Sequence, residues 1–175
     1  DLVRMFAWQT GYAAFTVSAT ALTQVKSYID RQEAHHAKKS FREELVELID
    51  TTELNAVIID IRDFSGGIAF PTENPVLKDM VSDKCGAHDM KDFVRMLHDK
   101  DIYVIGRVTV FQNPLYTKKH PEQAVQHKNG GVWKDHKGLA FVDVGATAYW
   151  ETVAELSKES YAIGFDELNF DYIRY

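Results

Sequence analysis

Apolar residues fall into short runs along the chain, and amphipathic stretches separate these runs. β-Branched and aromatic residues predict strands at 2–8, 55–61, 102–111 and 165–172. Apolar residues at helical spacing predict helices over 18–34, from 41 to 49, after Asp89 and from 147 to 163. Alternating strands and helices, with strands that are apolar on both faces, are typical of a parallel sheet covered by helices.

Two of the predicted helices have a defined inner face. Asp89 is expected to cap the first, and the side chains expected to pack inward are Met90, Phe93, Val94 and Leu97. Thr147 is expected to cap the second, which Gly164 would close. Its inward side chains are expected to be Trp150, Val153, Ala154 and Tyr161.

Two architectures fit this order of elements: an open doubly wound sheet and a (β/α)8 barrel. An open sheet that binds a nucleotide needs a glycine-rich turn directly after its first strand, where this chain has Gln9-Thr10-Gly11-Tyr12. A barrel calls for polar residues at the C-terminal ends of its strands, which the chain supplies. A complete barrel takes about 250 residues. The 175 residues therefore predict the first four β/α units of an α/β, TIM-barrel-type domain.

Charged residues gather near the ends of the predicted strands. Side chains alternate along a strand, so the last strand presents Glu167, Asn169 and Asp171 on one face. We expect this face to point into the barrel, with Asp171 at its mouth.

The two preceding strands add to the same interior. Ile58, Asp60 and Arg62 share a face of one strand, and Arg107 lies on a face of the next with Tyr103, Ile105 and Thr109. Three acids and two arginines are close to charge balance, and arginine pairs with carboxylates through two parallel hydrogen bonds.

Three stretches resemble motifs of one family, in order: 52–63 followed by Ser65-Gly66, then 102–114, and then 164–175. Trp133-Lys134-Asp135 and Phe141-Val142-Asp143 resemble the loop that links the last two motifs. The family is DUF4015, a family of glycosidase-like barrel domains. The match runs from about residue 41 to the end and covers the N-terminal half of the family domain.

The chain also departs from the family. Residues 16–39 look like an insertion or a divergent loop within a single partial barrel domain over 1–175. Where the family usually has a proline-containing turn, this chain has Phe141-Val142-Asp143-Val144.

The resemblance implies a glycoside hydrolase that acts on a polysaccharide, outside the cell or in its envelope. Hydrolysis of a glycosidic bond needs two carboxyl groups. Asp171 is the candidate nucleophile or stabiliser of the transition state, and the acid/base residue would come from the half of the barrel not present here. This chain alone is therefore expected to be inactive. The alternative for Asp171 is a structural ion pair with Arg174 or Arg62.

The other candidates are assigned to sugar binding or to support. Residues expected to contact the carbohydrate are Trp8, Asp60, Arg62, Arg107, Asn169 and Arg174, with Arg62 more exposed than Asp60. Trp133 also suits stacking on a sugar ring, although core packing is the commoner use of tryptophan. Glu167 lies deeper and is expected to orient Arg107 as a supporting ion pair. A second hypothesis keeps these contacts in a non-catalytic carbohydrate-binding or cell-surface module.

Composition excludes several other classes. A net charge of −6 disfavours a nucleic-acid partner, and no apolar run approaches the ~20 residues of a membrane span. Cys85-x-x-His88 has zinc-like spacing but no second pair follows, so neither a metal nor another cofactor is expected. Unpaired edges of a half barrel predict that the rest of the barrel, or a partner chain, covers them.

Overall fold

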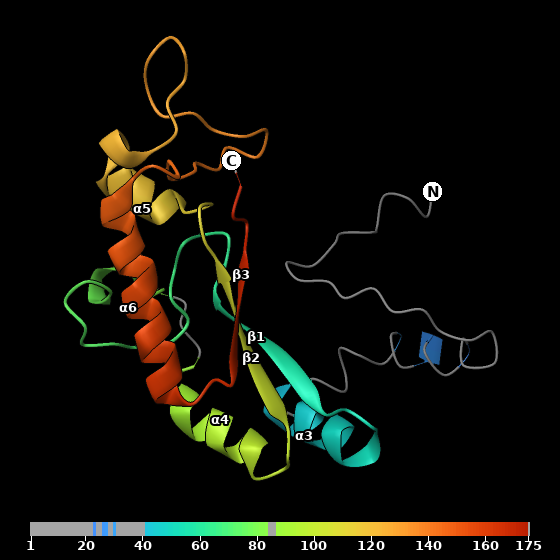
Figure 1. Ribbon diagram of the computed structural model, residues 1–175. Coiled ribbons are helices and arrows are strands. Elements are labelled where there is room, and N and C mark those ends of the chain that lie inside the picture. The colour runs from blue at the N-terminus through green and yellow to red at the C-terminus, as the bar shows by residue number, and fades with distance from the viewer. Residues whose placement is uncertain (1–22, 24–25, 28–29, 31–40, 84–86, 175) are drawn as a thin grey trace. The chain divides into compact units, whose positions relative to one another are not determined.

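A computed structural model describes residues 23, 26–27, 30, 41–83 and 87–174 of the chain. These residues belong to two units, 1–52 and 53–175, and each is described by itself. The predicted strand at 2–8 lies outside the described residues, as do Trp8, Cys85 and most of 16–39. The second unit contains the sheet, whose strands are labelled in Figure 1, and every site residue discussed below.

In the first unit the helix α3 spans Phe41–Thr51 and confirms the helix predicted from 41 to 49. Among the side chains of α3 that the structure describes, Ile49 is a buried apolar one. Residues 23, 26, 27 and 30 are also helical, as expected for the helix over 18–34.

The second unit is built on a parallel sheet of three strands. They are β1 (Ala56–Arg62), β2 (Tyr103–Thr109) and β3 (Glu167–Asp171), in the order β1-β2-β3. Three of the four predicted strands are thus confirmed, with the parallel pairing that strands joined by helices require. Their C-terminal ends lie at the same edge of the sheet (Figure 1).

Helices and short turns connect the strands. The longer helices are α4 (Met90–His98), between β1 and β2, and α6 (Thr147–Ile163), between β2 and β3. The shorter ones are η2 (Lys78–Met80), α5 (Pro114–Lys119) and η3 (Pro121–Gln123). The core lies between the long helices and one face of β2, where Val104 and Val108 are fully buried.

The helix α4 follows the sequence pattern closely. All four side chains expected to face inward are buried: Met90, Phe93, Val94 and Leu97. Asp89 occupies the N-cap position, but its side chain makes no capping hydrogen bond, so that part of the prediction is wrong.

The helix α6 confirms the predicted position but not the predicted face. Its N-cap is Ala146, and its buried side chains are Tyr149, Thr152, Leu156 and Ser160. Trp150 and Tyr161, which were expected inside, are 55% and 82% exposed. Ser160 is buried without penalty because its hydroxyl donates to the carbonyl of Leu156 at 2.7 Å. Two polar residues therefore occupy the buried stripe, and a purely hydrophobic pattern points to the wrong side.

Close packing across the sheet depends on Gly106 in the middle of β2. A Cβ atom there would lie 3.0 Å from side-chain atoms of Leu168 and Phe165, and 3.1 Å from Ile61. At the end of α6, Gly164 adopts φ 117° and closes the helix as predicted. Gly106 thus allows β3 to pack close to β2, and Gly164 lies against Val94 of α4.

The opposite face of the sheet is open in the part of the chain that the structure describes. Ile58 is 62% exposed there, and Tyr103 is 45% exposed. The register pairs Asn169 with Arg107 and Asp171 with Thr109, so the polar face predicted for β3 is the open face. This face positions the candidate site.

Candidate active site

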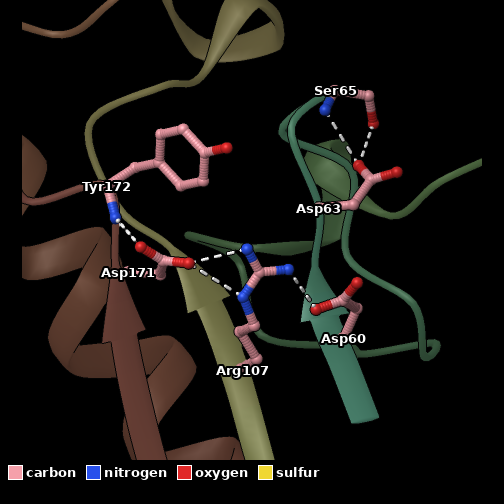
Figure 2. A network of polar contacts seen from close by, with 6 residues as sticks. All are labelled: Asp60, Asp63, Ser65, Arg107, Asp171 and Tyr172. Carbon is pink, nitrogen blue, oxygen red and sulfur yellow. Dashed lines mark hydrogen bonds and ion pairs between the residues drawn. The ribbon is translucent and has the colours of Figure 1, made fainter. Parts of the chain in front are cut away.

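Three charged side chains meet at the C-terminal ends of the strands. Asp60 comes from β1, Arg107 from β2 and Asp171 from β3 (Figure 2). In the register Asp60 is the partner of Arg107, and Asp171 is the partner of Thr109, two residues further along β2. Side chains two residues apart share a face, so all three lie on the open side of the sheet.

Arg107 forms the centre of this network. Its Nε and Nη2 donate to Oδ2 of Asp171 at 3.0 and 2.6 Å, and its Nη1 donates to Oδ1 of Asp60 at 3.0 Å. The guanidinium thus forms ion pairs with two carboxylates, one from each neighbouring strand (Figure 2). The side chains remain accessible, with exposed fractions of 31% for Arg107, 50% for Asp60 and 42% for Asp171.

The strand β3 ends immediately after Asp171. Tyr172 adopts φ 54°, a left-handed conformation that is uncommon for a residue with a side chain. Its backbone N–H donates to Oδ1 of Asp171 at 2.7 Å, so both carboxylate oxygens of Asp171 accept hydrogen bonds. In the view of Figure 2 the Tyr172 ring lies above the side chains of Asp171 and Arg107.

These contacts fix the charge of the two central groups. Hydrogen bonds from Arg107 and from the Tyr172 backbone hold the pKa of Asp171 below its ordinary value. The hydrogen bond to Asp171 in turn raises the pKa of Arg107. At neutral pH Asp171 is therefore a carboxylate, which suits a nucleophile or a stabiliser of positive charge and not a proton donor.

A hollow of about 900 Å³ lies beside the network, on the side of β1. Its polar lining residues are Asp60, Asp63, Ser65, Asp79, Ser82 and Asp83, with Phe64 and Leu115 among the apolar ones. Asp63 closes a tight turn, because its Oδ1 accepts from the backbone N–H and the hydroxyl of Ser65 at 2.9 and 2.5 Å (Figure 2). The hollow is wide enough for a small-molecule group such as a sugar ring.

Asp63 and Ser65 were not among the predicted site residues. Their sequence signal was the turn Asp63-Phe64-Ser65-Gly66 directly after a strand, where barrel enzymes place functional loops. Asp63 follows β1, so the alternation of side chains within the strand does not fix its direction.

The prediction for Arg62 is wrong. Asp60 is the exposed residue of the pair, whereas Arg62 is fully buried. The register shifts between Asp60 and Arg62, where a bulge brings Arg62 opposite Val108. One extra residue turns Arg62 to the helix side, and its guanidinium carbon lies 5.6 Å from the centre of the Tyr149 ring. Arg62 therefore does not reach the open face.

Glu167 also differs from the prediction. The ion pairs of Arg107 join it to Asp60 and Asp171, and Glu167 instead accepts a long hydrogen bond of 3.5 Å from the hydroxyl of Tyr103. Neither ion pair of Arg107 was predicted: the structural partner expected for Asp171 was Arg174 or Arg62, and the observed one is Arg107.

The remaining candidate residues are Asn169, Arg174 and Trp133. Asn169 is exposed on the open face beside Arg107. Arg174 is exposed, lies 5.5 Å from the centre of the Tyr172 ring and adds a favourable charge near Asp171. Trp133 is half-buried and packs on Phe141, with ring centres 5.7 Å apart. Packing is thus its observed use.

Asp166 belongs to the junction between α6 and β3. Its carboxylate accepts from the backbone N–H of Val104 at 2.7 Å and contacts His98 at 2.9 Å. Among the residues that the structure describes, no group of three or more His, Cys, Asp or Glu side chains could hold a metal ion.

An α/β domain with a parallel sheet and an arginine-held carboxylate pair at its strand ends fits the class of glycosidase-like domains. The chain belongs to the family DUF4015, described as "Putative glycosyl hydrolase domain", whose profile matches residues 28–175. No curated protein matches the sequence.

Solved structures extend this assignment. A hypothetical protein from Ruminiclostridium thermocellum ATCC 27405 is 34% identical, with a TM-score of 0.71 over 77% of this chain and 70% of that one. A maltogenic α-amylase from Thermotoga neapolitana is 18% identical, with a TM-score of 0.53 over 75% of this chain and 34% of that one. An α-galactosidase from Thermus thermophilus is 15% identical, with a TM-score of 0.52 over 73% and 26%.

At these identities the two enzymes show a shared fold alone, and the chain spans about a third or less of their length. Separately, none of the helices described here is long and apolar enough to span a membrane.

Proposed function

We propose that this chain is part of a glycoside hydrolase with a (β/α)8 barrel, acting on a polysaccharide outside the cell or in its envelope. Asp171 is its nucleophile or the carboxylate that stabilises the oxocarbenium-like transition state. The supporting observation is the Asp171–Arg107 pair on the open face, at the edge of the sheet where barrel enzymes place their catalytic residues.

The assignment of catalytic roles follows from the charge of Asp171. Its pKa is lowered, so it is ionised when substrate arrives and does not serve as the general acid. The acid/base residue comes from a later strand of the barrel, across the sugar from Asp171. Asp60, Asn169 and Arg174 surround Asp171 with groups that bind sugar hydroxyls, and the hollow beside Asp60 provides room for a neighbouring sugar.

The test compares two carboxylates of the same strand. In the natural full-length protein, assayed on a panel of polysaccharides, Asp171→Asn should reduce kcat by about a hundredfold or more, because the charge that faces the transition state is lost. Glu167→Gln is the matched control: it removes a charge from the same face of β3, but its residue lies outside the Arg107 network. Its activity should stay within about threefold of wild type. Equal turnover by wild type and Asp171→Asn would remove Asp171 from the mechanism.

A second candidate function is a non-catalytic carbohydrate-binding module. It is favoured by one observation: both oxygens of Asp171 already accept hydrogen bonds from the protein. This function predicts that the full-length protein binds a polysaccharide without cleaving it. Asp171→Asn would then leave the affinity for the polysaccharide unchanged.

A further inference from the structure

Arg62 is a buried cation that the proposed mechanism does not use. Its side chain is fully buried, and its Nε donates to the backbone carbonyl of Thr109 at 3.0 Å. Its Nη1 and Nη2 are buried and have no hydrogen-bond partner among the residues that the structure describes. Burial accordingly lowers the pKa of the guanidinium, and the ring of Tyr149 is its aromatic neighbour at 5.6 Å.

Such a group is a poor choice for stability alone. Buried polar groups without partners are costly, and replacing a buried charge by an apolar side chain of similar size is often neutral or favourable. A methionine at position 62 would fill a similar space and still contact the Tyr149 ring. What methionine cannot supply is the N–H that holds the carbonyl of Thr109.

The carbonyl of Thr109 lies at the C-terminal end of β2, next to Asp171 on the neighbouring strand. Thr109 is the register partner of Asp171, and the next residue, Val110, donates its backbone N–H to the Asp171 carbonyl at 2.8 Å. The Val110 carbonyl is held by the Tyr149 hydroxyl at 2.6 Å. Two consecutive carbonyls at the end of β2 are thus fixed from the helix side, one by Arg62 and one by Tyr149.

A second contact strengthens the same junction. Asn113, also fully buried, donates from Nδ2 to the Tyr149 hydroxyl at 3.0 Å, and its Oδ1 accepts from the Tyr116 backbone. Tyr149 is therefore held in place as well, and the end of β2 is fixed relative to α6. Arg107 precedes Thr109 by two residues on β2, so its backbone is held together with the end of the strand. This fixes the position from which its side chain pairs with Asp171.

We infer that Arg62 is a positioning residue: by holding the Thr109 carbonyl it sets the geometry in which Arg107 grips the Asp171 carboxylate. The inference rests on the proposed function for its catalytic meaning, but its structural content is measurable without turnover. The charged groups that act on Asp171 are Arg107 and Arg174, with Asp60 on the other side of Arg107, and Arg62 is not among them. Any effect of Arg62 on Asp171 must pass through the backbone of β2.

The Tyr172 amide supplies the readout, because it donates to Oδ1 of Asp171 and its chemical shift follows the protonation of that carboxyl. The full-length protein is labelled with ¹⁵N-tyrosine and titrated, and Tyr172→Phe identifies the signal. Asp171→Asn, in which the transition disappears, assigns it to Asp171. In Arg62→Met the midpoint of this transition should move upward, since a misplaced Arg107 stabilises the carboxylate less.

Two further measurements separate positioning from simple structural support. Arg62→Met should unfold within a few degrees of wild type, because the lost Thr109 hydrogen bond is offset by removal of the unpartnered Nη groups. On a cleaved polysaccharide, its kcat should fall about tenfold with KM unchanged, as expected for a misplaced catalytic group. Arg95→Met is the matched control: Arg95 is exposed on α4, forms an ion pair with Asp92, and should leave the Tyr172 titration unchanged.

An unchanged titration midpoint in Arg62→Met overturns the inference, whatever happens to thermal stability. Should Arg62→Met not fold, Arg62→Leu decides, because leucine is a smaller apolar side chain that also has no N–H to donate to the Thr109 carbonyl. A folded Arg62→Leu with the wild-type midpoint overturns the inference equally. Absence of glycosidase activity in the wild type would remove the proposed function and leave the titration result standing.

Discussion

The carboxylate of Asp171 is held by hydrogen bonds and is still accessible to solvent. Its Oδ2 accepts two hydrogen bonds from Arg107, and its Oδ1 accepts one from the Tyr172 backbone. Nevertheless 42% of the side chain is exposed, so the carboxylate is reachable from solvent. The left-handed Tyr172 makes this possible by ending β3 and turning its N–H back toward the carboxylate. Unusual backbone conformations of this kind concentrate at functional sites.

The Arg107–Asp171 pair makes stability depend on pH in a defined direction. The pKa of Asp171 is lower in the folded state than the ordinary value of about 3.9, so the pair stabilises the fold above that pH. This contribution is lost as the pH falls from about 4 through the folded pKa. Because both side chains are partly exposed, we expect about 1 kcal/mol or less at neutral pH.

The measurement is thermal unfolding of wild type and Asp171→Asn at pH 7 and pH 2.5. Wild type should be the more stable protein at pH 7, and the difference should narrow at pH 2.5. Added salt at pH 7 should narrow the gap, because exposed ion pairs are screened. A difference that persists unchanged at pH 2.5 would show that the Asn side chain disturbs packing instead.

Single residues also show what sequence could predict at this scale. Alternation predicted that Asp60, Arg107 and Asp171 share the open face, because the spacing of two holds along any regular strand. It could not predict which acid Arg107 would choose. That choice depends on the register between strands, which places Asp171 within reach of Nε and Nη2.

At the scale of elements, the bulge in β1 explains why strand alternation predicts the wrong direction for Arg62. Up to Asp60 the strand alternates as expected, and one extra residue then reverses the direction of Arg62. The buried face of α6 was predicted wrongly for another reason. Two of its buried side chains, Thr152 and Ser160, are polar, so a hydrophobic pattern does not reveal them. The four inward residues of α4 were predicted because all of them are apolar.

The loops after β1 and β2 are joined by a contact that only glycine permits. Gly66 has φ 87°, and a Cβ atom there would lie 1.9 Å from Oδ1 of Asn113. Gly131 has a similar φ of 82° but open space around it, so it provides a matched control. Gly131→Ala should cost about 1–2 kcal/mol from backbone strain alone. Gly66→Ala should cost about 1–3 kcal/mol more, because Asn113 must move.

Urea unfolding of both variants in the full-length protein measures this difference. The outcome expected is a clearly lower midpoint for Gly66→Ala, with a similar slope for the two curves. Equal midpoints would mean that the two loops do not pack against each other, and that Asn113 is free to adopt another position.

At the scale of the whole molecule, the described sheet has one covered and one open face. The covered face carries the core, with Val104 and Val108 buried against the helices. The open face presents Ile58 and Tyr103 to solvent next to the charged rim. Bulky apolar residues below a polar rim are what the interior of a barrel requires. The proposed barrel therefore predicts that the remaining strands cover Ile58 and leave the outer helices exposed.

Thiol labelling tests this arrangement with two cysteines on opposite sides of the sheet. In a Cys85→Ser background, Ile58→Cys should react rapidly in the 175-residue chain and slowly in the natural full-length protein, where the barrel interior excludes the reagent. Tyr161→Cys is the control: Tyr161 is 82% exposed on α6, away from the open face, and should react rapidly in both. Equal rates at position 58 in the two proteins would mean that nothing covers this face, and the barrel, with the catalytic mouth proposed at Asp171, would have to be abandoned.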